Sequence, residues 1–481
     1  MLGYFGKFHS QTACDSPPTR RALKALAVVI VALGSLSLLW LAPARAKDEP
    51  PEGEPPREEL TIPSTGVVRQ GQGQRVLVSD GQGEQVVALL HVEVGDRRLV
   101  IMPSGRMRSL AISETAITKK PFRSATKEEV LAELKSGRLA KFKSRSTARY
   151  VYLYNTSEEF YRGTSRILET MYPATVAYFK RQKLPVHDPA GPLIVLMFRT
   201  EDEFQRYEPV PQGVAAYYSA ETNHVVMYEQ SDLVEMAPEL AVKQAIGVVA
   251  HEGVHQVLNN IGVQQRLSRW PLWTAEGLAE YFAPTSVDKR LRWKGVGMPN
   301  DFRIHELESL LKKRSNIDGE MVSQTVAASG LSSAGYASAW ALTHYLASRK
   351  KEKFHAYLRE VAKLEPLEPR DPRQATAQRK QLFTKFFGSD YEAIERAVIE
   401  HVQSLPYTDP IANQTHYVVM LNTSALRTAG VTSSPASVRR WQEETLTKVP
   451  ASVRAQATFD VMPFENRSLA EQYARQWLQS R

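Results

Sequence analysis

Gly247-Val-Val-Ala-His-Glu-Gly-Val-His-Gln-Val-Leu258 is the most informative stretch of this 481-residue chain. It contains the pattern HExxH, in which His251 and His255 stand four residues apart. On a helix these side chains project from the same face and can bind one metal ion, while Glu252 can take a proton from a water on that ion. The flanking residues are mostly apolar, which predicts a buried helix in which a metal satisfies the polar groups. The alternative is a surface helix with two unrelated histidines, and the apolar flanks count against it.

A second motif, Trp273-Thr-Ala-Glu-Gly-Leu-Ala-Glu-Tyr-Phe282, predicts another short helix. Glu276 stands 21 residues after His255. Two histidines and one glutamate are a known ligand set for catalytic zinc, which keeps one position open. Glu280 follows one turn later on the same face, where it can accept a hydrogen bond from the outer N–H of a ligand histidine. We therefore expect one Zn²⁺ per chain, held by His251, His255 and Glu276.

Together the two motifs resemble those of the gluzincin metallopeptidases, whose third ligand is a glutamate on the helix after the HExxH helix. The resemblance is closest to peptidase-MA-like proteins of bacterial envelopes, which share the run W-x-x-E-G-L-A-E-Y, and it covers roughly residues 148–405. It implies an α+β fold, in which a mixed sheet edged by a hairpin adjoins a helical lobe that carries the metal. It also implies peptide-bond hydrolysis with Glu252 as general base.

The resemblance also suggests a substrate-binding strand. Residues 213–228 are typical of a hairpin that turns at Glu221-Thr-Asn223. This hairpin is similar to the gluzincin edge hairpin, whose free strand edge pairs with the substrate backbone. Ala215, Ala216 and Tyr217 would then bind the substrate. The alternative is an ordinary sheet hairpin.

Tyr336 lies at the start of a helix expected over residues 335–346. Its placement is similar to that of the tyrosine which donates a hydrogen bond to the oxyanion in the aminopeptidase branch of the gluzincins. A phenol suits this role because it is neutral at pH 7 and is a good donor toward developing negative charge. The alternative is a packing role. His344, two turns later, is the competing proton donor, although a histidine in mid-helix is more often a core residue.

The first 46 residues predict export. Arg20, Arg21 and Lys24 precede an apolar run over residues 25–41, and Ala44-Arg-Ala46 offers small residues for cleavage. The run is near the lower length limit of a membrane-spanning helix, so an uncleaved N-terminal anchor is the alternative. The expected location is secreted, periplasmic or in the cell envelope.

The rest of the chain divides by composition. Short alternating apolar runs separated by glycines predict a small all-β module, which we interpret as a spacer or docking domain. Residues 285–335 are rich in Lys and Arg and show little periodicity, so we expect a linking region there. The expected organisation is a signal peptide or anchor (1–46), a Pro/Glu-rich linker (47–60), an all-β module (61–122), a connecting helix (123–147), a zinc metallopeptidase domain (148–405) and a small β-α-β-α module (406–481).

Charge and cysteine content exclude other classes of protein. The formal net charge is +9, of which residues 1–46 contribute five basic residues and one acidic residue, so +5 remains. Because no basic stripe is interleaved with aromatic residues, nucleic acid is not an expected partner. The only cysteine, Cys14, precedes the apolar run, which leaves no disulfide framework or thiolate metal site for the remainder. We expect a peptide or protein substrate as partner, and membrane contact only if the N-terminal segment stays uncleaved.

The expected function is therefore that of a secreted zinc metallopeptidase. An endopeptidase is favoured because no substrate-amine anchor like that of the aminopeptidases is found. Two alternatives belong to other classes of protein. One is an envelope protein that keeps zinc and binds without cleaving, and the other is a scaffold whose flanking modules carry the function.

Overall fold

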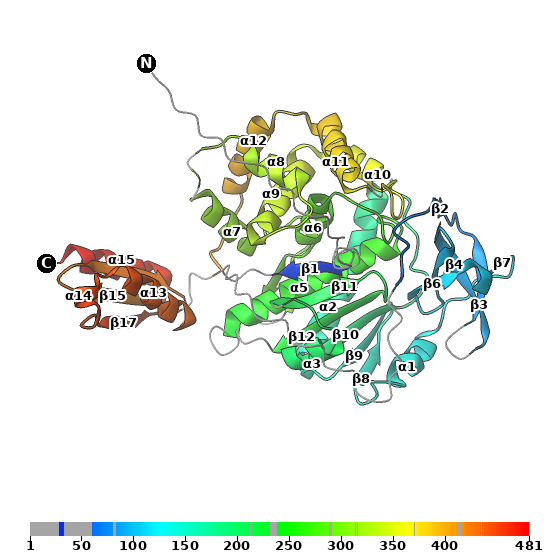
Figure 1. Ribbon diagram of the computed structural model, residues 1–481, viewed down its shortest axis with the longest axis horizontal. Coiled ribbons are helices and arrows are strands. Elements are labelled where there is room, and N and C mark those ends of the chain that lie inside the picture. Colours follow the sequence, from blue (N-terminus) through cyan, green and yellow to red (C-terminus); the bar gives the residue numbers. More distant parts are fainter. Residues whose placement is uncertain are drawn as a thin grey trace, which may run out of the picture.

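The computed structural model describes residues 28–32, 60–79, 83–211, 213–230, 238–287, 291–312, 314, 316–369, 371–410, 415–433 and 435–480. The architecture is mixed α and β. A central sheet has helices on both faces, a helical lobe lies beside it, a β module adjoins one side, and a small α/β module ends the chain (Figure 1).

The central sheet has the strand order β1-β11-β12-β10-β9-β8. Its strands are β1 Val28–Ala32, β8 Lys143–Ser146, β9 Tyr150–Tyr154, β10 Leu193–Thr200, β11 Val214–Ser219 and β12 His224–Gln230. The strands β9, β10 and β12 pair in parallel, whereas β8, β11 and β1 pair in antiparallel fashion with their neighbours. The sheet is therefore mixed, as expected, but its edge beside the β11–β12 hairpin is formed by β1 and not by the hairpin itself.

Helices cover both faces of this sheet. Tyr150, Tyr152 and Tyr154 of β9 pack on the side of α2 (Glu158–Arg181) and α5 (Pro238–Asn260). The intervening residues Val151 and Leu153 pack on the side of α1 (Lys127–Lys135) and α3 (Glu201–Tyr207). A strand that is buried on both faces needs an almost continuous apolar run, which explains the composition of β9 and β10.

Two glycines allow the helices that carry the motifs to approach their neighbours closely. At Gly253 of α5, a Cβ atom would lie 2.3 Å from Leu168 Cδ2 of α2. At Gly277 of α6 (Leu272–Phe282), a Cβ atom would lie 2.6 Å from the carbonyl oxygen of Ala339 in α9 (Ser333–Arg349). At Gly277 the added Cβ would meet backbone, so only glycine fits there without a backbone shift, whereas at Gly253 it would meet the side-chain ends of Leu168 and Met171. The motif helices are thus held against α2 and α9.

The expectation of a linking region at 285–335 is wrong, because much of this segment forms regular helices and strands. It contains a short hairpin and two helices of the helical lobe. The elements are β13 Thr285–Val287, β14 Leu291–Trp293, α7 Asp301–Leu311 and α8 Glu320–Ala327. The helix α7 buries Arg303 together with Ile304 and Leu307, so a charged residue takes a core position and obscures the apolar periodicity. The lobe is completed by α10 Lys351–Val361, α11 Pro372–Phe387 and α12 Tyr391–Gln403.

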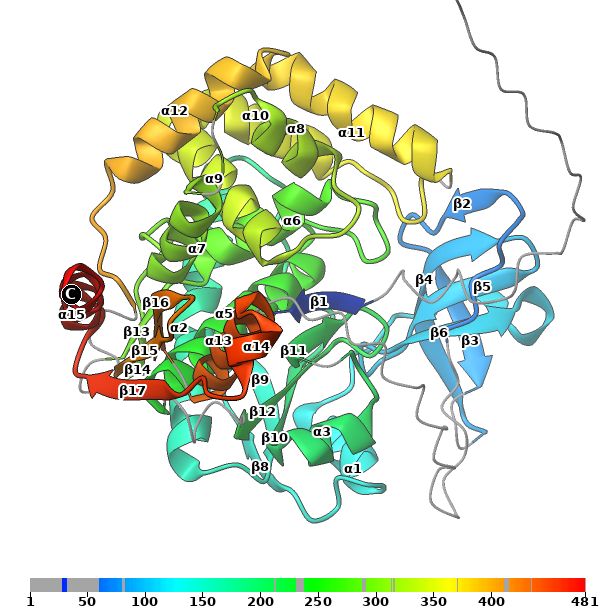
Figure 2. The same ribbon diagram turned by 60° about the vertical axis from the view of Figure 1, so that its left-hand side comes forward.

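The β module is an antiparallel sheet that packs against the central domain (Figure 2). Its strands are β2 Val68–Gln70, β3 Arg75–Ser79, β4 Gln85–Val94, β5 Arg97–Ile101, β6 Met107–Ala111 and β7 Ala116–Thr118. The backbone N–H of Met107 donates to the carbonyl of Glu221 in the β11–β12 turn over 2.7 Å. The buried Arg266, in the loop after α5, donates to the carbonyl of Gly105 over 2.6 Å. The module therefore contacts both the hairpin and the loop that follows the HExxH helix.

The C-terminal module differs from the expected β-α-β-α order. It contains β15 His416–Asn422, β16 Arg427–Thr432, α13 Pro435–Lys448, α14 Ala451–Arg454, β17 Phe459–Phe464 and α15 Arg467–Gln479. The additional strand, β16, is half-buried along its length and lacks an apolar run, so the sequence pattern hides it. The sheet order is β16-β15-β17, with α15 packed against Val418 and Met420.

The signal-peptide or anchor prediction for residues 1–46 lies outside the described residues except for β1. Within the described part of the chain, no helix is both long and apolar enough to cross a membrane. The strand β1 pairs antiparallel with β11, with Val29 opposite Tyr218 and Ile30 opposite Tyr217.

Candidate metal centre

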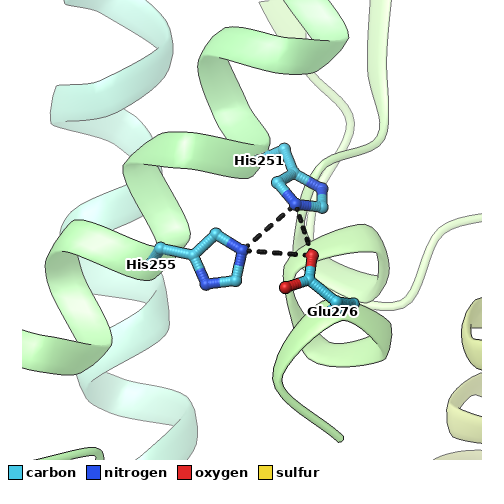
Figure 3. A group of neighbouring side chains, drawn as sticks. All are labelled: His251, His255 and Glu276. Carbon is cyan, nitrogen blue, oxygen red and sulfur yellow. Dashed lines mark hydrogen bonds and ion pairs between the residues drawn. The ribbon is translucent and has the colours of Figure 1, made fainter. Parts of the chain in front are cut away.

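Three side chains from two helices converge at one point. Both α5 histidines and Glu276 of α6 point toward one another (Figure 3). His251 Nε2 lies 3.1 Å from His255 Nε2 and 3.1 Å from Glu276 Oε2, and His255 Nε2 lies 3.4 Å from the same oxygen. None of the three residues is more than 1% exposed. This buried group can hold a metal ion.

The spacing of the three atoms fits a small tetrahedral cation. Ligands about 2.0–2.1 Å from such an ion lie roughly 3.3 Å from one another. Without a cation, two imidazole nitrogens at 3.1 Å can share at most one proton, and Glu276 Oε1 has no hydrogen-bond partner among the described residues. Burial opposes the negative charge of Glu276, but His255 and His251 outweigh it and lower its pKa to about 2. The donor set is thus two imidazoles and one carboxylate anion.

Glu252 lies between the metal group and the β11–β12 hairpin. It is fully buried, and its Oε2 accepts a hydrogen bond from the backbone N–H of Tyr218 in β11 over 2.8 Å. Its Oε1 has no hydrogen-bond partner within the described part of the chain. Burial raises the pKa of Glu252 to about 8, and a cation beside it would lower that value. One oxygen is therefore fixed by β11 while the other is available.

Glu280 contacts the outer nitrogen of a ligand histidine. His251 Nδ1 lies 3.0 Å from Glu280 Oε1, although the angle is not that of a hydrogen bond; the negative charge of this carboxylate favours the tautomer with the proton on Nδ1, which leaves Nε2 for a metal. Arg303 donates to Glu280 Oε1 over 2.6 Å, and Asn300 donates to Oε2 over 2.9 Å. Burial opposes ionisation of Glu280, but Arg303 and His251 outweigh it and hold its pKa well below the usual range.

Tyr336 lies beside the metal group. Its ring centroid is 6.1 Å from that of His251, and the Arg303 guanidinium lies 5.3 Å from the Tyr336 ring centroid. The side chain is 4% exposed. Burial, followed by the nearby carboxylates Glu276 and Glu252, raises the pKa of Tyr336 far above its usual value. The phenol is therefore neutral at pH 7.

His344 is engaged elsewhere. The Arg349 Nε–H donates to His401 Nδ1 over 3.2 Å, so His401 carries its proton on Nε2 and donates it to His344 Nδ1 over 2.8 Å. His344 Nε2–H then donates to the carbonyl of Gly297 over 3.0 Å. Burial, and then His401, lower the pKa of His344 to about 4. Because eight residues of helix span about 12 Å, His344 is not brought to the metal group with Tyr336.

The expected substrate-binding residues lie on β11, where their side chains alternate between faces. Tyr217 packs on the α3 face, where its hydroxyl donates to Glu208 over 2.7 Å, and Ala215 packs on the same face. Ala216 packs on the α5 face. The edge that we expected to be free is paired with β1 in this structure. The group of β11 that contacts Glu252 is the backbone N–H of Tyr218.

Three groups at this centre were not identified from the sequence. They are the Tyr218 backbone N–H, the Asn300 amide and the Arg303 guanidinium. Asn300 offered one signal, since an asparagine before Asp301 is typical of a helix N-cap, and its side chain does accept the backbone N–H of Arg303. That signal predicts the start of α7 but not its contact with Glu280.

A family described as "Protein of unknown function (DUF1570)" matches residues 245–368, which are 124 of the 481 residues. The matched segment runs from α5 into the loop after α10, so it includes the three residues of the metal group. It also includes Glu252 and Tyr336. No curated protein matches the chain. The similarity therefore coincides with the metal centre without assigning it an activity.

Proposed function

We propose that this protein is a zinc-dependent metallopeptidase. The observation that carries the proposal is the position of Glu252, whose Oε2 is fixed by β11 and whose Oε1 is unpaired beside the ligand group. Two imidazoles and a carboxylate suit zinc better than the hard cations Mg²⁺ and Ca²⁺, which prefer oxygen ligands. When bound, zinc would supply Lewis-acid activation of a water molecule and of the scissile carbonyl group.

The residues of the chain have distinct roles in this proposal. Glu252 takes a proton from the attacking water through its unpaired oxygen and later passes that proton to the leaving amine. Tyr336 donates its phenolic hydrogen to the carbonyl oxygen as negative charge develops there, and its neutral form at pH 7 supports this role. His251, His255 and Glu276 hold the metal, while Glu280 fixes the tautomer of His251.

The β11 edge is the proposed binding strand for the substrate backbone. An extended peptide that pairs there would pass the Tyr218 N–H and Glu252. In the full chain β1 occupies this edge in antiparallel register; β1 lies in the segment expected to be removed as a signal peptide, and its removal would free the edge for a substrate. Binding of this kind needs no free peptide terminus, which is consistent with an endopeptidase.

A second candidate is a zinc-containing envelope protein that binds or scaffolds without cleaving. Two observations favour it. His251, Glu252, His255 and Glu276 are each at most 1% exposed, and the β11 edge is already paired. A catalytic centre requires that a peptide reach these residues, so this candidate predicts zinc without turnover.

A peptide-library digest analysed by mass spectrometry distinguishes the two functions. We expect the zinc-loaded protein to cleave internal peptide bonds, chelation to stop cleavage, and added zinc to restore it. Because a removable metal is required, this pattern excludes a contaminating serine peptidase. Stoichiometric zinc without any cleavage would favour the binding protein.

A further inference from the structure

Arg303 is an unusually buried charge at the start of α7. Arg303 is only 1% exposed, and its guanidinium contacts Glu280, Glu306 and the ring of Tyr336. Moving an arginine out of water costs several kcal/mol unless its charge and N–H groups are paired. The neighbouring Arg314 binds carboxylates too, but its side chain is 19% exposed. The contacts of Arg303 therefore suggest a role at the metal centre.

The guanidinium connects two parts of that centre. Glu280 uses the same oxygen, Oε1, to contact Arg303 at 2.6 Å and His251 Nδ1 at 3.0 Å. Asn300 occupies the other oxygen of Glu280, so the carboxylate is held at both ends. The centroid of the Tyr336 ring lies 5.3 Å from the central carbon of the same guanidinium. Arg303 thus contacts Glu280, which supports the proposed ligand His251. It also contacts Tyr336, the proposed oxyanion donor.

Glu306 completes the arrangement. Arg303 donates to Glu306 over 2.5 Å, and the Ser333 hydroxyl donates to the same side chain. Ser333 is the first residue of α9, the helix that carries Tyr336. Arg303 therefore links α7 to α6 through Glu280, and to α9 both directly at the Tyr336 ring and through Glu306 and Ser333. A lysine could supply the charge, but a compact ammonium cannot pair with both carboxylates and stack on a ring in the same way.

We propose that Arg303 is a positioning residue, which orients Glu280 toward His251 and holds the Tyr336 ring beside the metal group. The part that concerns His251 rests on the contacts alone. The part that concerns Tyr336 rests on the proposed function. Arg303 touches neither metal nor substrate in this proposal, and it acts through its two neighbours.

The experiment is a zinc titration in competition with a fluorescent chelator, on the full chain. The variants are Arg303→Met, Glu280→Gln, the double variant, and Arg314→Met as a matched control that also breaks a buried carboxylate pair. We expect Arg303→Met to weaken zinc binding roughly 10-fold and Glu280→Gln roughly 10–100-fold. The double variant should bind zinc within about twofold of Glu280→Gln, because Arg303 acts through Glu280.

The control separates positioning from general stability. Arg314→Met should lower the melting temperature while leaving zinc affinity within about twofold of wild type. Arg303→Lys should fold where Arg303→Met does not, and its zinc affinity should lie between those of Arg303→Met and wild type, because it keeps the charge but loses the two-carboxylate pairing. If peptide turnover is established, Arg303→Lys should also have a reduced kcat with little change in KM.

Two results would overturn the inference. One is folded Arg303→Met or Arg303→Lys that retains wild-type zinc affinity and wild-type kcat. The other is a double variant whose losses are the full product of the two single losses. Failure of the proposed function would look different, because zinc-loaded wild type would then lack turnover while the affinity differences persisted. Wild type that binds no zinc would overturn both proposals.

Discussion

Replacing Tyr336 with phenylalanine removes one hydroxyl group and leaves a buried ring in place. The ring contacts with His251 and Arg303 do not need the hydroxyl, so zinc content and melting temperature should stay close to wild type. If the phenol stabilises the oxyanion, its loss should lower kcat roughly 100–1000-fold, or about 3–4 kcal/mol of transition-state stabilisation. The assay is single-turnover cleavage of a quenched fluorescent peptide selected from the library digest.

His344→Gln is the matched comparison, because it alters the competing donor on the same helix. This histidine bonds to His401 and to the Gly297 carbonyl, so the substitution disrupts one buried and one partly buried hydrogen bond. We expect a stability loss of about 1–3 kcal/mol, with turnover nearly intact. A fully active Tyr336→Phe together with an inactive, zinc-loaded His344→Gln would refute the reasoning and would favour a histidine donor.

The remaining predictions concern the metal and pH. Purified wild type should carry about one zinc ion per chain, and His255→Ala should lose this zinc, as metal analysis after dialysis would show. Glu276→Ala should weaken zinc binding less completely. Zinc retained by His255→Ala would contradict the ligand assignment. Glu280→Gln should cost roughly 10–100-fold in zinc affinity or turnover without unfolding the domain, by chelator competition and circular dichroism. His344 is neutral in the fold with a pKa near 4, against 6.5 for an unperturbed group, so the unfolded chain binds more protons between these values. The free energy of unfolding of the metal-free protein should therefore fall as pH falls from about 6.5 to 4. The urea midpoint of His344→Gln should depend less on pH in this range than that of wild type. The same pH dependence in both proteins would contradict this.

The parts of the centre that depend on local spacing could be predicted from the sequence. His251 and His255 lie one turn apart, and so do Glu276 and Glu280, so helix periodicity alone places each pair on one face. Meeting of the two helices is a tertiary event, and its prediction relied on the resemblance to gluzincins. The strand β9 and the helix α3 also depend on local signals, a continuous apolar run in β9 and an N-cap in α3, where the Thr200 side chain accepts the backbone N–H of Glu203.

Contacts between distant segments could not be predicted in this way. Arg303 is 23 residues from Glu280, and no periodicity connects an arginine in α7 with a carboxylate in α6. Tyr218 contacts Glu252 through its backbone N–H, a group that every residue except proline carries. In both cases the side-chain identity is uninformative until the fold brings the groups together. For the same reason, β16 was missed, because its half-buried residues show no apolar pattern.

The most direct test of the central claim is turnover by zinc-loaded Glu252→Gln. The substitution keeps the size of the side chain, and its amide oxygen can still accept the Tyr218 N–H, but it removes the base. We predict one zinc ion per chain, a melting temperature close to that of wild type, and peptide cleavage reduced at least roughly 100-fold, as expected for loss of a general base. Cleavage at the wild-type rate by this zinc-loaded variant would contradict the account.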